Sequence, residues 1–296
     1  MFVVGNITAG GTGKTPFVIW LARTLTEMGL HPGIVSRGHG GSETKRPIRV
    51  FPDSDAEAVG DEPPLLAART GLPVVVCQDR VKAVQHLLEQ AECDLVIADD
   101  GLQHYALARD VEVAVVDGHR GLGNGRLLPA GPLREPASRL AEVDWVVSSG
   151  RPAGTDAGWA GFEYLLTVNP VRFVPLSGSG DPISATEFAA CHANVNAVAG
   201  IGNPGRFVQT LKELGLSPIL NAYPDHHAFE GEEVVFDNDW PVVCTEKDAT
   251  KLRALDGLPD NLYYLEIDST VSALDGTSGA DKLRALLDMH GIRVAQ

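Results

Sequence analysis

The strongest constraint on the fold is a glycine-rich segment, residues 8–15, that separates a short apolar run from a helical pattern. It reads TAGGTGKT and matches the phosphate-binding pattern G-x-x-x-x-G-K-[ST] except at the first position, where Thr8 replaces glycine. The run Phe2-Val3-Val4 precedes it, and residues 15–28 place apolar side chains at helical spacing before Gly29. This order of strand, glycines, Gly-Lys-Thr and helix favours a phosphate-binding loop over a plain glycine-rich turn.

Each part of such a loop has a task. Its glycines let backbone N–H groups turn toward phosphates at the helix N-terminus. Lys14 adds a mobile cation, and the Thr15 hydroxyl can bind Mg²⁺. The residues expected to bind the nucleotide are Thr8, Ala9, Gly10, Gly11, Thr12, Gly13, Lys14 and Thr15.

Apolar strand-like runs alternate with helical patterns through the first half of the chain. The runs are residues 2–4, 33–36, 74–77, 95–98, 113–116 and 145–148. Helical patterns at 63–70 and 81–90 separate some of them. Continuously apolar strands separated by helices predict an α/β fold, with a P-loop NTPase-like, mostly parallel sheet that helices cover on both faces.

A stretch rich in glycine and proline, Gly150 to Asp156, predicts a domain boundary. We expect a nucleotide- and substrate-binding domain at residues 1–150. Residues 151–296 are expected to form hinge strands and a smaller α/β domain. Within the hinge, residues 162–176 are interpreted as extended segments that turn at Asn169-Pro170.

Charge narrows the classes of ligand. The chain has 24 basic and 39 acidic residues and a formal net charge of −15, which disfavours a general nucleic-acid binder. The first 150 residues carry 14 basic and 19 acidic groups, and the rest carry 10 and 20, so an anionic ligand should prefer the first half. No apolar run approaches the roughly 18 residues of a membrane span.

Two acidic pairs are candidates for metal and proton chemistry. Asp99 and Asp100 end an apolar run, where a parallel strand would carry them beside the phosphate-binding loop. Either one alone could cap the turn before Gly101, but the pair favours metal binding. Asp61 and Glu62 stand at the start of a predicted helix, where the helix dipole favours acids, so a structural and a functional role are equally supported.

Two motifs of the second half remain open from the residues alone. A segment carrying Asp225, His226 and His227 could supply a general base, an orienting partner for a carboxylate or a metal ligand, although a solvated turn is the simpler interpretation. Residues 200–205 match G-x-G-x-x-G, yet no acidic residue follows near Asn221 to bind a ribose. We interpret this segment as a tight entry to a helix.

Taken together, these motifs resemble those of the tetraacyldisaccharide 4′-kinases, which phosphorylate the lipid A precursor of Gram-negative bacteria. The resemblance covers almost the whole chain in the family's order and includes Thr8. Its blocks are residues 4–16 (VGNITAGGTGKTP), 35–41 (VSRGHGG), 60–63 (GDEP), 99–104 (DDGLQH), 131–136 (GPLREP), 200–204 (GIGNP), 224–227 (PDHH) and 245–248 (TEKD).

The resemblance implies a role for each candidate. Asp61 matches the family's catalytic base, and His226, from the second domain, matches the histidine that assists it. Lys14 would neutralise charge on the transferred phosphoryl group. The implied Mg²⁺ ligands are Thr15, Glu62, Asp99 and Asp100. The arginines implied in binding the substrate 1-phosphate or ATP are Arg37, Arg80 and Arg134.

The resemblance also implies roles for two single residues and one further segment. His104 would support the site rather than perform chemistry, and residues 245–248 would contact the nucleotide. His39 stands where the family usually has tyrosine, which would alter a local substrate contact without touching the catalytic residues.

The activity implied is transfer of the γ-phosphoryl group of ATP to the 4′-hydroxyl of a tetraacylated glucosamine disaccharide 1-phosphate, at the cytoplasmic face of the bacterial inner membrane. No nucleic acid and no obligate protein partner are implied. One alternative is a P-loop ATPase switch or binding protein that phosphorylates no small molecule. A second is a P-loop ligase or kinase acting on a soluble metabolite, which the extended motifs disfavour.

The resemblance implies a hydrophobic N-terminal segment that anchors family members to the inner membrane, and we expect the given chain to depart from the family there. Only seven residues precede Thr8, and the first apolar run is shorter than the roughly 5–6 residues of a typical strand. We therefore expect the start of the chain to be clipped and this form to bind membranes weakly.

Overall fold

The computed structural model describes residues 1–151, 162–177 and 180–294. The strands are β1 (Phe2–Gly5), β2 (Pro32–Ser36), β3 (Ile48–Val50), β4 (Val74–Val76), β5 (Leu95–Ala98), β6 (Val111–Asp117), β7 (Trp145–Ser149), β8 (Tyr164–Pro175), β9 (Ile183–Ser184), β10 (Asn194–Ala199), β11 (Ser217–Ala222), β12 (Val242–Thr245) and β13 (Leu262–Ala273). The α-helices are α1 (Lys14–Glu27), α2 (Ala56–Val59), α3 (Glu62–Thr70), α4 (Arg80–Gln90), α5 (Ala185–Cys191), α6 (Pro204–Glu213), α7 (Glu246–Leu252) and α8 (Gly279–Met289). Two short 3₁₀ helices, η1 (Ala137–Ala141) and η2 (Glu232–Val234), complete the elements.

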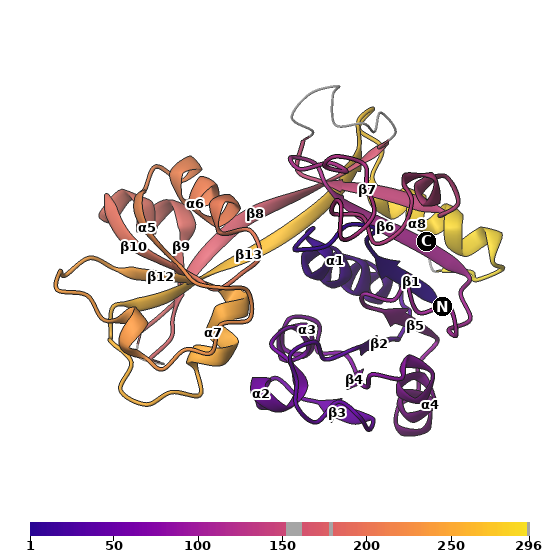
Figure 1. Cartoon of the computed structure of the whole chain (residues 1–296), viewed down its shortest axis with the longest axis horizontal. Coiled ribbons are helices and arrows are strands. Elements are labelled where there is room, and N and C mark those ends of the chain that lie inside the picture. The colour runs from indigo at the N-terminus through magenta and orange to yellow at the C-terminus, as the bar shows by residue number, and fades with distance from the viewer. Residues whose placement is uncertain (152–161, 178–179, 295–296) are drawn as a thin grey trace.

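One sheet runs through both lobes of the molecule (Figure 1). The first lobe contains β1 to β7, and the second contains β10 to β12. Among the described residues its strand order is β11-β10-β12-β13-β8-β7-β6-β1-β5-β2-β4-β3, with β9 beside β8. Strands β7, β6, β1, β5, β2 and β4 pair in parallel, and β3 at the edge of this first lobe pairs antiparallel with β4. The α/β fold with a mostly parallel sheet is therefore confirmed.

Helices cover both faces of the first-lobe sheet, as its continuously apolar strands require. On one face α1 contributes Phe17 and Leu21 and α3 contributes Leu66, all buried, to a core shared with β1 and β6. On the other face α4 buries Leu87 against β2 and β5. The parallel strands β1, β2, β4, β5 and β6 thus have a core on either side, which explains why their sequences do not alternate between apolar and polar residues.

The second lobe is built on the parallel strands β11, β10, β12 and β13. Helices α5 and α6 bury Phe188 and Leu211 on one face of these strands, and α7 buries Leu252 on the other. The two long strands β8 and β13 pair antiparallel and join the lobes (Figure 1).

The predicted turn at Asn169-Pro170 is wrong, because β8 passes through both residues without interruption. Pro170 pairs with Ile267 and Arg172 with Glu266, so Val171 is an extra residue in a bulge. On the side of β8 away from β13, the described residues place no strand beside Pro170. Its missing N–H therefore costs no ladder hydrogen bond on that side.

The division of the chain into 1–150 and 151–296 stays a prediction. Most of the expected boundary, from residue 152 onward, lies outside the described residues. Helix α8, near the end of the chain, buries Leu283 and Leu287 in the core of the first lobe. Across the described ranges, no helix combines the length and the apolar character needed to cross a membrane.

Candidate active site at the junction of the two lobes

The phosphate-binding loop leaves the carboxyl end of β1 and enters α1 at Gly13. Gly10 and Gly13 have φ angles of 91° and 88°, a left-handed conformation that glycine adopts without strain. Asn6, buried beneath the loop, donates from Nδ2 to Thr12 Oγ1 at 3.2 Å. These contacts fix the loop around the N-terminus of α1, where backbone N–H groups can bind an anion.

The amino-terminal half of the loop contacts the segment at residues 132–133. The backbone N–H of Ala9 donates to the Pro132 carbonyl at 2.8 Å, and Thr8 is buried and bridges to Leu133. Thr8 is therefore packed against the segment that supports the loop. Gly11 and Thr15, by contrast, line the cavity between the lobes.

Lys14, the first residue of α1, reaches the acids at the end of β5. Its Nζ lies 3.3 Å from Asp100 Oδ1, and Arg134 Nη1 lies 3.3 Å from the same carboxylate. Burial would raise the pKa of Asp100, but the charges of Lys14 and Arg134 hold it below its ordinary value. Asp100 thus stays ionised between two cations beside the loop.

Asp99 occupies a different environment from its neighbour. Its side chain is buried, Ser36 Oγ donates to Oδ2 at 3.1 Å, and Oδ1 has no hydrogen-bond partner among the described residues. Burial, together with the charges of Glu62 and Asp100, raises the pKa of Asp99 to about 7. An unpaired buried carboxylate oxygen is costly unless a cation compensates it.

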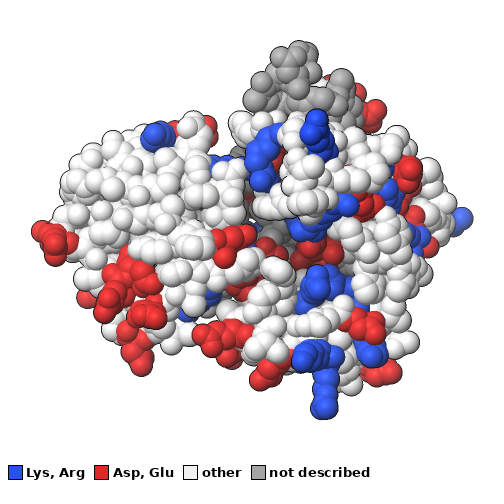
Figure 2. All heavy atoms as spheres, in the orientation of Figure 1, with Lys and Arg blue, Asp and Glu red and all other residues white. Residues whose placement is uncertain are grey.

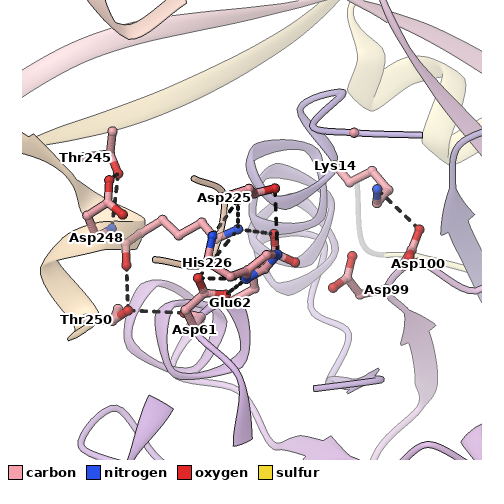
Figure 3. A network of polar contacts seen from close by, with 12 residues as sticks. Lys14, Asp61, Glu62, Asp99, Asp100, Asp225, His226, Thr245, Asp248 and Thr250 are labelled. Atoms are coloured by element: carbon pink, nitrogen blue, oxygen red, sulfur yellow. Dashed lines mark hydrogen bonds and ion pairs between the residues drawn. The ribbon is translucent and has the colours of Figure 1, made fainter. Parts of the chain in front are cut away.

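Asp61 and His226 meet across the lobes. Asp61 precedes α3, is only 4% exposed, and its two carboxylate oxygens each lie 3.1 Å from His226 Nδ1 (Figure 3). Burial alone would raise the pKa of Asp61, but the hydrogen bond with His226 and nearby positive charges lower it. The same hydrogen bond raises the pKa of His226. Residues 165 positions apart thus form one acid–histidine pair.

Two lysines of α7 approach the same carboxylate, and the sequence motifs do not predict this role for either of them. Lys247 Nζ and Lys251 Nζ each lie 3.7 Å from Asp61 Oδ2. Lys247 also contacts Glu62 at 3.2 Å and Asp225 at 3.4 Å. The four-residue spacing of the two lysines within a helix, which puts them on one face, was the available signal.

The TEKD segment, expected near the nucleotide, begins α7 and caps it. Thr245 Oγ1 accepts from the Asp248 N–H at 3.1 Å and donates to Asp248 Oδ2 at 2.7 Å. Next to it, Glu246 forms a buried ion pair with Arg69 of α3 at 2.6 Å. The segment therefore holds α7 against α3 and directs Lys247 at the Asp61–Glu62 pair.

The remaining predicted residues border the same cavity, which has a volume of about 860 Å³. Arg80 is buried and donates to the Asp100 carbonyl at 3.2 Å, and burial lowers the pKa of Arg80. Arg37 is exposed and lies on the cavity wall, as do Arg134 and Glu62. Figure 2 shows this hollow between the lobes, with acidic and basic side chains at its edge.

The histidines singled out from the sequence take different positions. His104 lines the cavity and has a pKa lowered mainly by burial, whereas the His39 ring packs edge-on against His226 at 5.0 Å. His227 stacks on Tyr223 and lies 3.0 Å from Glu233, so both of these contacts lie within the second lobe.

No set of three or more histidine, cysteine, aspartate and glutamate side chains in the described part of the chain is grouped so as to hold a metal ion. The carboxylates named above instead lie in two groups, Asp99 and Asp100 beside Lys14, and Asp61 and Glu62 beside Lys247 (Figure 3). Asp100 and Glu62, one from each group, line the cavity that the phosphate-binding loop also lines.

Comparisons with known proteins agree with this arrangement. A family model described as tetraacyldisaccharide-1-P 4′-kinase matches residues 1–287. The tetraacyldisaccharide 4′-kinase of Alkalilimnicola ehrlichii is 52% identical over 267 residues, covering 90% of this chain and 77% of the relative. That of Hahella chejuensis is 46% identical over 273 residues, covering 92% and 78%.

A solved structure is also similar, the "apo" form of LpxK from Aquifex aeolicus in complex with ATP. It superposes with a TM-score of 0.75 at 26% sequence identity, covering 97% of this chain and 87% of that one. The family match over nearly the whole chain, the close relatives and the shared fold lead to one conclusion. The chain belongs to the tetraacyldisaccharide-1-P 4′-kinase family.

Proposed function

We propose that this protein transfers the γ-phosphoryl group of ATP to the 4′-hydroxyl of a tetraacylated glucosamine disaccharide 1-phosphate, a step of lipid A biosynthesis. The observation that carries the proposal is the pairing of Asp61 with His226 across the lobes, where His226 lines the same cavity as the phosphate-binding loop. A nucleotide switch requires the phosphate-binding loop, but it does not require an acid–histidine pair that accepts a proton from a second substrate.

Asp61 is the proposed general base. As the 4′-oxygen attacks the γ-phosphorus, the hydroxyl proton passes to an Asp61 carboxylate oxygen. The bond from the γ-phosphorus to the bridging oxygen breaks, and ADP leaves. His226 acts as a positioning residue, because its Nδ1 contacts both carboxylate oxygens and holds the group in one orientation. The lowered pKa of Asp61 keeps its carboxylate ionised, the form that a general base requires.

Lys14 is the proposed cation for the transferred phosphoryl group. Its Nζ lies beside Asp100 and borders the cavity together with residues 10–15 of the loop. A primary ammonium at the start of α1 adds its charge to that of the helix N-terminus, where the β- and γ-phosphates of ATP would lie.

The environment of Asp99 fits a magnesium ion. Asp99 Oδ1 is buried and unpaired among the described residues, and burial together with neighbouring negative charge raises the pKa of Asp99, so a divalent cation would compensate this carboxylate. The residues that would hold Mg²⁺ are Thr15, Glu62, Asp99 and Asp100. When bound with ATP, Mg²⁺ would neutralise charge that develops on the phosphoryl oxygens.

Arg37, Arg80 and Arg134 are proposed to bind phosphate groups of the lipid or of ATP. All three border the cavity, and arginine can contact a phosphate with two parallel hydrogen bonds. The acylated substrate resides in a bilayer, so we place the reaction at the cytoplasmic face of the inner membrane, without nucleic acid or an obligate protein partner.

We also propose that the lobes close about the paired strands β8 and β13. The contacts of Asp61 with His226 and Lys247 join a residue of the first lobe to residues of the second. Opening this junction would separate the proposed base from its histidine and admit both substrates.

The test measures ADP release by the purified protein with and without the tetraacyl disaccharide 1-phosphate in detergent micelles. A kinase releases ADP in proportion to lipid phosphorylated, so we expect release to depend on the lipid. ADP release that the lipid does not change would instead support a switch or binding protein that uses ATP on its own.

A further inference from the structure

Arg206, on the first turn of α6, reaches from the second lobe to the first. Asn203 caps this helix, its Oδ1 accepting from the Arg206 N–H at 3.3 Å. The guanidinium Nη1 donates to Ser149 Oγ at 2.8 Å, and Ser149 is the last residue of β7. A tight entry to a helix, which the sequence predicts for residues 200–205, explains the glycines of this segment but not the contact of Arg206 across the lobes.

The Arg206 guanidinium lies at the phosphate-binding loop. A methyl group built on Gly13, the residue that precedes α1, would lie 3.7 Å from Arg206 Nη1. One built on Gly150 would lie 3.9 Å from Nη2. Gly202 reaches the loop as well, since a methyl there would lie 3.2 Å from the Gly11 nitrogen. The segment that carries Arg206 is therefore packed against the loop where an anion would bind.

Arg206 differs from the other arginines near the loop in its partners. Arg120 contacts Asp117 at 3.2 Å, and Arg134 contacts Asp100 at 3.3 Å. Among the described residues no carboxylate lies within ion-pair distance of Arg206, and Ser149 is the acceptor its guanidinium has. Burial lowers the pKa of Arg206, with only the charge of Asp117 opposing it.

A guanidinium has five N–H donors, and a half-buried one without an anion leaves several of them unused. Arg206 also borders the cavity that Gly10, Gly11 and Lys14 line. The Arg206 guanidinium lies at the loop, has unused donors and has no carboxylate partner among the described residues. These three features indicate that its partner is an anionic ligand at the loop.

We propose that Arg206 is a nucleotide-binding residue, supplied by the second lobe, whose guanidinium contacts the phosphate chain of ATP. The inference rests on the proposed function for the identity of the nucleotide. The second lobe would then contribute Arg206 to ATP binding, in addition to contributing His226 to the contact with Asp61. Because ATP would contact both lobes, its binding would favour their closure.

The experiment compares wild type with Arg206→Met, which keeps the apolar stem and removes the donors, and with Arg206→Lys, which keeps a charge. Dissociation constants for ATP and adenosine are measured by calorimetry with Mg²⁺ and without lipid. We expect Arg206→Met to weaken ATP binding about 10- to 100-fold and Arg206→Lys about 3- to 10-fold, because charge-assisted hydrogen bonds are lost. The affinity for adenosine should stay within twofold.

The matched control is Lys212→Met, which removes an exposed cation from the same helix. It should leave the ATP dissociation constant within twofold, and the melting temperature of each variant without nucleotide shows that the fold is retained. An unchanged ATP dissociation constant in Arg206→Met, or an equal loss of ATP and adenosine affinity, would overturn the proposal. A wild type that binds no ATP would instead contradict the proposed function.

Discussion

His226 Nδ1 lies 3.1 Å from both carboxylate oxygens of Asp61, although one residue belongs to the second lobe and the other precedes α3 in the first. A symmetric contact of this kind holds the carboxylate plane facing the imidazole. It also makes the proposed base dependent on the placement of the two lobes, because neither lobe contains both groups.

Replacing Asp61 by asparagine keeps the shape of the side chain and removes its ability to accept a proton. We expect kcat for lipid phosphorylation to fall about 10²- to 10⁴-fold, the usual contribution of a general base. The dissociation constant for ATP should change less than about threefold. Steady-state kinetics and calorimetry measure both, and Asp53→Asn, at an exposed position of the same segment, is the control. Near-normal turnover by Asp61→Asn would remove Asp61 from the base role.

Replacing His226 by alanine should lower kcat less than the Asp61 change, about 10- to 100-fold, because the base remains but is no longer oriented. The two residues act as a unit, so the double variant should be no slower than Asp61→Asn alone. A double variant whose losses multiply would show that His226 acts independently of Asp61.

Lys247→Met removes a cation that contacts Asp61, Glu62 and Asp225. The three carboxylates would then repel one another, and we expect kcat/KM to fall about tenfold or more, with partial recovery in Lys247→Arg. Lys212→Met, on the exposed face of α6, should match wild type. Equal kcat/KM for Lys247→Met and wild type would limit Lys247 to packing.

Much of the first lobe was predictable because its signals are local. Helix α1 and strand β5 follow directly from helical spacing and an apolar run, and the loop between β1 and α1 follows from its glycines. The strand β8 was not predicted correctly, because Asn169-Pro170 reads as a turn unless the long partner β13 is known.

The site was only partly predictable for a similar reason. Asp99, Asp100 and Lys14 lie at the ends of neighbouring elements of one sheet, so strand order brings them together. The contacts of Lys247 with Asp61 and of Arg206 with Ser149 depend on how the second lobe sits on the first. The spacing of Lys247 and Lys251 puts both on one face of α7, but nothing in either segment encodes where that face lies relative to the first lobe.

Stability should depend on Glu112, a mostly buried carboxylate that contacts Arg109 at 2.6 Å and also contacts Arg139. Burial would raise its pKa, but the hydrogen bonds from Arg139 and Arg109 lower it. We expect Glu112→Gln to lower the free energy of unfolding at pH 7 by about 1–3 kcal/mol. A carboxyl group with a lowered pKa stabilises the fold above its unfolded pKa, and this contribution is lost as the pH falls through the folded value.

Urea titrations at several pH values check this prediction. The difference between wild type and Glu112→Gln should be largest near pH 7 and shrink below the ordinary glutamate pKa of about 4.5. Glu142→Gln alters an exposed carboxylate on the same Arg139 and should change stability by less than about 0.5 kcal/mol. A difference that grows as the pH falls would contradict the assigned direction of the pKa shift.

Transfer of label from [γ-³²P]ATP to the tetraacyl disaccharide 1-phosphate tests the account most directly. Wild type should place the label on the 4′-oxygen of the lipid, and Asp61→Asn should place almost none there while still binding ATP. ATP hydrolysis by wild type without label in the lipid, under conditions in which a relative from the same family phosphorylates it, would contradict the account.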